Sequence, residues 1–162
     1  MFQFPYQQAL QATADVHAMK ERTAARQSVT TRSLTSYAGF PREYAKDILQ
    51  VNLTDQQAAT LELVSKPPYR LIERGGHSTG KTAKNAVWLS YLYDTLPKCF
   101  IIVTAPREET IANTIFRELR KLRMGAVARG KLKTDGFTGP RSLEMRSSED
   151  HVCLGTTATN VH

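Results

Sequence analysis

Residues 75 to 82 read Gly75-Gly76-His77-Ser78-Thr79-Gly80-Lys81-Thr82, which fits the phosphate-binding loop pattern: a glycine, four free positions, then Gly-Lys followed by Ser or Thr. The glycines let backbone N–H groups converge on phosphate oxygens, and a helix that follows adds the positive end of its dipole. Lys81 is expected to reach the terminal phosphates, and the Thr82 hydroxyl is expected to be one ligand of Mg²⁺. The stretch therefore predicts that a nucleoside triphosphate binds here with Mg²⁺.

The flanks of this loop fit a strand before it and a helix after it. Tyr69, Leu71 and Ile72 form a short apolar stretch after two prolines, as expected for a strand that enters from a turn. After the loop, apolar residues recur at helical spacing up to Leu96, and Pro97 ends the pattern. A glycine-rich turn with an unrelated lysine is the alternative interpretation of the motif.

A second strand and a second helix follow along the chain. Residues 99–104 form a continuous apolar run rich in β-branched residues, which is typical of a strand covered on both faces. Apolar residues at helical spacing over 111–122 predict a helix, and the glycines of 125–140 predict a mobile loop. Alternating residues over 143–157 predict a β-hairpin with its turn at 147–150. The order of elements predicts an α/β fold of the P-loop NTPase type, a parallel sheet flanked by helices, with a C-terminal β-hairpin.

The chain before the loop divides into an arm and two short helices. Residues 1–36 are rich in Gln, Ala, Thr and Arg with little apolar pattern, so we assign them to an N-terminal arm that is helical or flexible. Residues 41–49 begin with a proline and predict a short amphipathic helix. Thr54 followed by Gln57 matches a capping box at the start of another helix. From these patterns we assign 37–162 to one P-loop domain.

Composition restricts the class of protein. The 162 residues are 41% hydrophobic and 23% charged, which is ordinary for a globular chain, and no apolar run reaches membrane-spanning length. The N-terminus lacks the pattern of a secretory signal, so we expect a cytoplasmic location. Cys99 and Cys153 lie in apolar stretches and are expected to be reduced thiols. His151 lies near Cys153, but no further residues complete zinc-ligand spacing.

The net charge of +7 indicates a polyanionic partner or a solvated basic surface. Basic residues concentrate in one stretch, where Glu118 alone opposes them: Arg117, Arg120, Lys121, Arg123, Arg129, Lys131 and Lys133. Such a cluster can follow the phosphate backbone of double-stranded DNA, and binding would then weaken with salt. A helix face that is only solvated explains the same pattern.

Five segments together resemble the N-terminal ATPase region of the terminase large subunit, the DNA-packaging motor of tailed bacteriophages. They are the helix at 44–49, the Leu53-Thr54-Asp55-Gln56-Gln57 entry, Arg74 with the loop, the strand that ends Val103-Thr104-Ala105-Pro106, and the hairpin region 143–157. The likeness covers residues from about 37 to about 160. It implies ATP and Mg²⁺ as cofactors, duplex DNA as a partner, a homo-oligomeric ring, contacts with a portal protein and a small terminase subunit, and the host cytoplasm as location.

The resemblance also implies roles for single residues. Lys81 and Thr82 match the family's contacts with phosphate and Mg²⁺. Gln57 matches a glutamine that contacts adenine, with Gln56 as the candidate if the register differs by one. The alternative for Gln57 is a helix-surface residue of the capping box. Arg74 matches an arginine that steadies the γ-phosphate or signals hydrolysis to a neighbouring subunit, and an ordinary surface arginine at a strand end is its alternative.

The chain departs from the family in the half of the site that hydrolyses ATP. Family members have an apolar strand that ends in a carboxylate for Mg²⁺ and a glutamate that orients water. The apolar runs here lead into Thr104-Ala105-Pro106 and Gly155-Thr156 instead. The resemblance thus implies that 37–162 is a partial P-loop ATPase domain, with an incomplete sheet truncated before that strand. No acidic cluster in the sequence fits the family's nuclease domain. We expect nucleotide binding with little or no hydrolysis.

Three further interpretations stay open at the level of sequence. The chain is a non-catalytic nucleotide- or DNA-binding fragment, a helicase-like P-loop ATPase, or a small kinase. In the kinase interpretation the loop at 125–140, with Arg129, would serve as the lid.

Overall fold

The computed structural model describes residues 33–65, 72 and 80–157. The chain divides into two compact units, Met1–Ser33 and Leu34–His162, and every described element lies in the second. The predicted N-terminal arm therefore lies almost wholly outside the described residues. The elements are η1 (Leu34–Tyr37), α2 (Pro41–Tyr44), η2 (Ala45–Leu49), α3 (Asp55–Leu63), α4 (Lys81–Thr95), β1 (Cys99–Ala105), α5 (Glu108–Ile111), η3 (Ala112–Phe116), α6 (Arg117–Ala128), β2 (Glu144–Ser148) and β3 (His151–Thr157).

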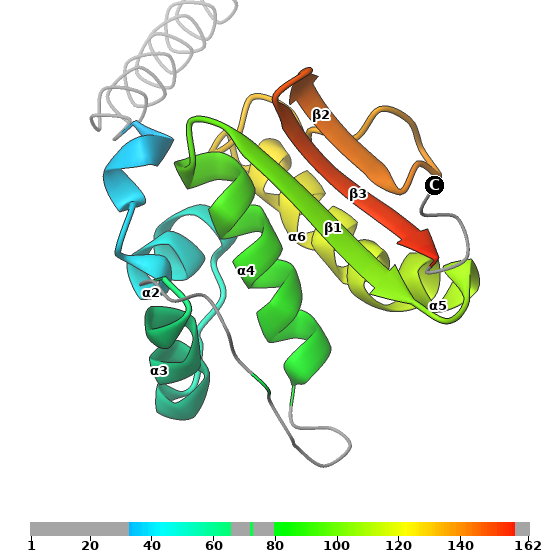
Figure 1. The fold of residues 1–162 in the computed structure, drawn as a ribbon. Coiled ribbons are helices and arrows are strands. Elements are labelled where there is room, and N and C mark those ends of the chain that lie inside the picture. Colours follow the sequence, from blue (N-terminus) through cyan, green and yellow to red (C-terminus); the bar gives the residue numbers. More distant parts are fainter. Residues whose placement is uncertain (1–32, 66–71, 73–79, 158–162) are drawn as a thin grey trace, which may run out of the picture. The chain divides into compact units, whose positions relative to one another are not determined.

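The strands form an open three-stranded sheet in the order β1-β3-β2 (Figure 1). β1 is parallel to β3, with Cys99 opposite His151 and Ala105 opposite Thr157. β2 pairs antiparallel with β3, and the register is irregular between Arg146 and Ser148. The strand predicted at 99–104 and the C-terminal hairpin are therefore confirmed, and the fold is mixed α/β.

The strand predicted before the phosphate loop lies mostly outside the described residues. Only Ile72 of that stretch is described, and it is 91% exposed and not part of a strand. The parallel pairing that the structure shows is that of β1 with β3.

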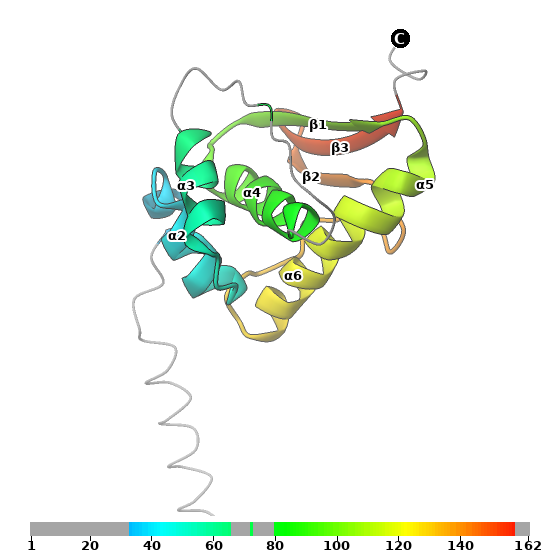
Figure 2. The ribbon, with the colours of Figure 1, turned by 90° about the horizontal axis from the view of Figure 1, so that it is seen from below.

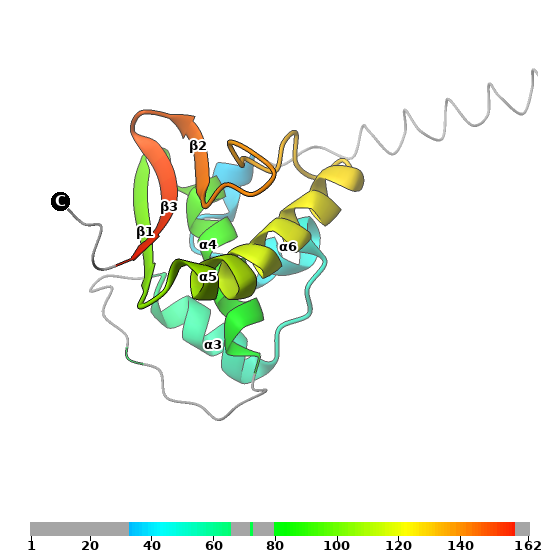
Figure 3. The same cartoon turned by 90° about the vertical axis from the view of Figure 1, so that its right-hand side faces the viewer.

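The described helices all lie on one face of the sheet (Figure 2). Side chains alternate along β1, so Cys99, Ile101 and Val103 belong to a core cluster with Leu89 of α4 and Phe116 of η3. Figure 3 shows the same two layers from the side, with α4, α5 and α6 next to the sheet.

The expectation that both faces of this strand are covered is wrong for the described part of the chain. Phe100 is 67% exposed and Ile102 is 48% exposed, because they point to the face that no described helix covers. A continuous apolar run cannot distinguish a strand that is buried on both faces from an edge strand with apolar residues on an open face.

A second core cluster joins the N-terminal helices to α4. Tyr44 of α2 is fully buried and packs with Tyr91 of α4, their ring centroids 5.6 Å apart. The helix predicted at 41–49 is confirmed as α2 followed by η2, a π-helical turn, with Pro41 at the first helical position. Gln50 ends it in the left-handed conformation, with φ of 56°.

The helix predicted at 111–122 is longer than expected. It runs as α5, η3 and α6 from Glu108 to Ala128, so Gly125 lies inside α6 and not in the predicted loop. The reason is tertiary, because the neighbouring Ala126 is fully buried in the core. The connection after α6 is also anchored: Leu132 is buried, and Arg123 Nε donates to the carbonyl of Asp135 over 2.6 Å.

Candidate functional site

The start of α4 is the part of the phosphate-binding motif that the structure describes. Gly80 has φ of 74°, a left-handed conformation that glycine adopts without strain, and its carbonyl accepts a hydrogen bond from Lys84 N over 2.9 Å. Lys81 and Thr82 open the fifteen-residue helix directly after it. The other predicted members, Arg74 and Gly75, Gly76, His77, Ser78 and Thr79, lie outside the described residues.

Gln57 lies against this helix start. It closes the predicted capping box, which is confirmed: Gln57 N donates to the Thr54 hydroxyl over 3.3 Å, and Gln57 Oε1 accepts from Thr54 N over 3.0 Å. A Cβ added to Gly80 would lie only 2.6 Å from Gln57 Nε2. Gln57 therefore belongs to the capping box and also lies next to the phosphate motif. Gln56, the alternative candidate, is exposed.

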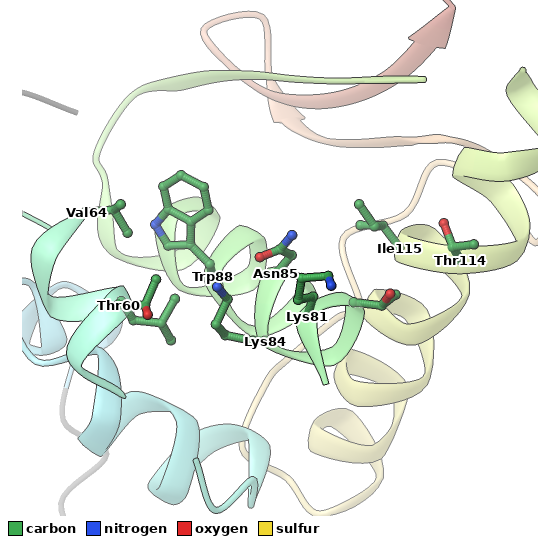
Figure 4. A pocket seen from close by; sticks show the side chains of 10 residues that line it. Thr60, Val64, Lys81, Lys84, Asn85, Trp88, Thr114 and Ile115 are labelled. Carbon is green, nitrogen blue, oxygen red and sulfur yellow. The ribbon is translucent and has the colours of Figure 1, made fainter. Parts of the chain in front are cut away.

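A cavity of about 520 Å³, which we call the α4 groove, lies along one side of α4 (Figure 4). Its lining comes from three elements: Thr60, Leu61 and Val64 near α3, Lys81, Thr82, Lys84, Asn85 and Trp88 of α4, and Thr114 and Ile115 of η3. None of these lining residues is acidic. Within the described ranges the buried Trp88 Nε1 has no hydrogen-bond partner. The sequence analysis missed this groove, because it forms between elements far apart in the chain.

A buried polar cluster ties α2, α4 and α6 together. Arg123 Nη1 lies 3.0 Å from both Asp94 carboxylate oxygens and 2.8 Å from Ser90 Oγ, and the Tyr44 hydroxyl donates to Asp94 Oδ2. The Arg123 and Asp94 side chains are 3% and 5% exposed. Burial and the neighbouring Asp94 carboxylate raise the pKa of Tyr44 well above its usual value. Arg123 is therefore a core residue, although its sequence position suggested a DNA-facing side chain.

The remaining predicted DNA-binding residues differ in their surroundings. Arg120 is half-buried, because its guanidinium covers the Phe137 ring at 3.8 Å and donates to the Ser142 carbonyl over 2.7 Å. Arg129 donates to the Leu49 carbonyl over 3.0 Å, yet most of its side chain stays exposed. The other four are exposed: Arg117, Lys121, Lys131 and Lys133.

Glu118 partly neutralises the exposed side of α6. Its carboxylate lies 3.8 Å from Arg117 and 4.0 Å from Lys121. Such exposed pairs contribute little stability, and solvent screens them. Lys131 and Lys133, which follow α6, are exposed, and in the described chain no acidic partner is seen for either.

The residues considered for a metal site have other roles. His151 Nε2 lies 2.7 Å from the Tyr93 carbonyl, so this nitrogen carries the proton and donates it. Cys153 is fully buried, and burial raises the pKa of its thiol to about 12. Over the part of the chain that the structure describes, no three His, Cys, Asp or Glu residues come together as metal ligands.

Within the described segments, no helix has the length and apolar character needed to cross a bilayer. Comparison with protein families, with characterised proteins and with solved structures finds no match to this chain.

Proposed function

We propose that the chain binds ATP with Mg²⁺ through residues 75–82 and is the nucleotide-binding portion of a terminase large subunit, the motor that packages duplex DNA. The observation that supports this most directly is the left-handed Gly80 immediately before Lys81 and Thr82 at the start of α4. This arrangement places an ammonium group, a hydroxyl and the positive helix end together, as phosphate binding needs. The finer fold we propose is the P-loop type, a parallel sheet flanked by helices.

The described residues divide the work of binding. Lys81 neutralises charge on the terminal phosphates, and the exposed Thr82 hydroxyl fits one position in the oxygen shell of Mg²⁺. When bound, that ion neutralises charge on the phosphates. Because the sequence shows no apolar strand that ends in a carboxylate for Mg²⁺, we propose that hydrolysis by this chain stays near background. Its activity in isolation is therefore proposed to be binding.

Gln57 is proposed to contact the adenine. Its side-chain amide can donate and accept at once, which suits the edge of adenine. Its Nε2 is positioned at the last glycine of the motif, and the capping box fixes the side chain that carries it. Gln56, which is exposed, is the weaker of the two candidates.

Duplex DNA is proposed to follow the exposed basic residues of the C-terminal half. Lys131 and Lys133 carry this proposal best, with Arg117, Lys121 and Arg129 beside them in sequence. We exclude Arg123 from the proposed DNA-binding residues, because its side chain is buried in an ion pair with Asp94. In the complete motor these subunits would form a ring that meets a portal protein and a small terminase subunit.

The phosphate-loop assignment is tested by titrating labelled ATP, with Mg²⁺, against the native chain and Lys81→Ala. We expect the variant to bind at least about tenfold more weakly, because charge-assisted contacts with phosphate are lost. Lys98→Ala is the matched control. Lys98 is an exposed lysine that pairs with Asp150, and it lies beyond the C-terminus of α4, whereas Lys81 lies at the N-terminus. Equal binding by native chain and Lys81→Ala would remove the assignment.

A further inference from the structure

Residues 130–142, which we call the return segment, fold back along α6 after that helix ends. Lys131 N donates to the Ala126 carbonyl over 2.9 Å, and Arg123 Nε donates to the Asp135 carbonyl over 2.6 Å. As the segment continues, it therefore meets α6 at positions nearer to the start of the helix. Both contacts use main-chain groups of the segment, so they hold its backbone against the helix.

Arg120 holds the last part of the return segment. Its guanidinium donates to the Gly139 carbonyl over 3.2 Å and to the Ser142 carbonyl over 2.7 Å. It also covers the Phe137 ring at 3.8 Å, and the residue is half-buried. The charge of Arg120 is thus used inside the fold, where it fixes the backbone of the segment.

The return segment ends in a tight turn that presents Arg141. Ser142 N donates to the Gly139 carbonyl over 3.2 Å, which places Pro140 and Arg141 at the two central positions of a β-turn. Proline favours the first of these positions, because its ring fixes φ. The Ser142 hydroxyl accepts a hydrogen bond from Glu144 N over 3.0 Å, so the residue after the turn is held as well. Arg141 is therefore an exposed cation on a fixed backbone.

The exposed cations of the return segment are spread along α6. They are Lys131, Lys133 and Arg141, and in the described chain no acidic partner is seen for any of them. The contacts that anchor the segment extend over six residues of the helix, from Arg120 to Ala126, which is about 9 Å of helix axis. In duplex DNA, about 9 Å of axis carries two to three phosphates of one strand. The spread of these cations thus suits a row of phosphates better than a single anion.

The single carboxylate of the return segment does not cancel this charge. Asp135 is half-buried, and its Oδ1 accepts a hydrogen bond from Phe137 N over 3.1 Å. One carboxylate stands against the three exposed cations, so the segment keeps a net positive charge.

We propose that Arg141 binds a phosphate of duplex DNA, next to the phosphates bound by Lys131 and Lys133. This inference rests on the proposal that duplex DNA is a partner of the chain, and it adds a residue that the basic stretch at 117–133 does not include. A guanidinium can donate two parallel hydrogen bonds to one phosphate. Because Arg120 and the turn already hold the backbone of Arg141, little backbone freedom is lost when the contact forms.

Arg141→Ala tests the contact by fluorescence anisotropy of labelled duplexes in a salt series, without nucleotide. At about 0.1 M salt the affinity should fall about fivefold to tenfold, and the slope of log affinity against log salt should decrease by about one. Arg107→Ala is the matched control, since it removes the same exposed side chain thirteen residues before Arg120, about 20 Å along the helices. It should leave both quantities unchanged.

Pro140→Gly tests whether the turn positions Arg141. The variant keeps every charge, so the salt slope should stay at the native value. The affinity should fall about twofold to fivefold, because a glycine in the turn has more conformational freedom to lose on binding. Pro97→Gly makes the same change at an exposed proline after α4 and should not alter DNA binding. Circular dichroism checks that each variant folds.

The outcomes separate this inference from the proposal on which it rests. If the native chain binds duplex DNA and Arg141→Ala binds it with native affinity and slope, the role of Arg141 is wrong and the DNA proposal stands. Equal losses in Arg141→Ala and Arg107→Ala would show an effect of net charge and would also overturn the role of Arg141. Native affinity in Pro140→Gly would overturn the positioning by the turn. A native chain that does not bind duplex DNA at low salt would overturn both proposals.

Discussion

At the scale of single residues, Asp94 and Arg123 form an ion pair whose side chains are both buried inside the described unit. A buried ion pair contributes little net free energy while both partners are present, but loss of one leaves a charge without compensation. Here the guanidinium also holds the Ser90 hydroxyl and the Asp135 carbonyl, so its loss would leave three acceptors with fewer donors. Arg123, which belongs to α6, thus links this helix to α4 and to the segment that follows α6.

Arg123→Leu should lower the free energy of unfolding by about 3–5 kcal/mol, because it leaves the Asp94 carboxylate buried without its partner. The double variant Arg123→Leu with Asp94→Asn should recover part of this loss, since no buried charge remains. Urea unfolding followed by circular dichroism measures both. Lys98→Ala, which breaks an exposed pair with Asp150, should change the same quantity by at most about 1 kcal/mol. A similar loss in Arg123→Leu and Lys98→Ala would contradict the role of the cluster.

Cys153 should resist alkylation in the folded chain at pH 8. Its pKa of about 12 lies far above this pH, so the reactive thiolate is scarce, and burial blocks access as well. The reactivity of the folded chain should rise gradually with pH as the thiolate fraction rises, but it should stay far below that of the unfolded chain at the same pH. Iodoacetamide labelling with mass spectrometry of the Cys153 peptide measures this, and the same reaction in urea at pH 8 is the control. Rapid native labelling at pH 8 would contradict the burial of this thiol.

At the scale of elements, patterns that depend on neighbours in sequence were predicted well. Thr54 and Gln57 form the expected capping box, Pro41 opens α2, and α4 ends before Pro97, because each of these signals acts within one turn of helix. The end of α6 was misjudged at Gly125, since burial of Ala126 outweighs the low helix propensity of glycine. The burial of Arg123 was missed for a similar reason, because its partner Asp94 lies 29 residues away in sequence and no local pattern reveals the contact.

Thr54→Ala should destabilise the unit by about 1 kcal/mol, because α3 loses the hydroxyl that accepts from Gln57 N. The Gln57 side chain keeps its hydrogen bond from the main-chain N–H of residue 54, which alanine also has, so the affinity of the folded chain for ATP should stay the same. Thermal unfolding and ATP titration measure the two effects. Thr110→Ala, a change at an exposed threonine of α5, is the matched control and should alter neither. A fall in ATP affinity under conditions where Thr54→Ala stays folded would contradict this, because it would show that the Thr54 hydroxyl, and not the main-chain N–H, holds Gln57 beside Gly80.

At the scale of the whole described unit, the helices cover one face of the sheet and leave Phe100 and Ile102 exposed on the other. The sequence predicted the helix half of the candidate site, because Gly80, Lys81 and Thr82 are neighbours in the motif. It did not predict the α4 groove, which depends on how α3, α4 and η3 pack. The sequence also did not distinguish the members of the basic stretch. In the structure Arg123 is buried in the core, Arg120 is half-buried, and the other basic residues are exposed.

The exposed cations lead to a prediction about DNA. If Lys131 and Lys133 contact phosphates, Lys131→Ala and Lys133→Ala should each weaken duplex DNA binding to a similar degree for every sequence. Each should also reduce the slope of log affinity against log salt by about one, since one fewer counterion is released. Fluorescence anisotropy of labelled duplexes at several salt concentrations measures this. Lys98→Ala removes an equal charge at the start of β1 and should leave the slope unchanged. A slope that falls equally in all three variants would show that net charge, and not a DNA-binding surface after α6, governs the interaction.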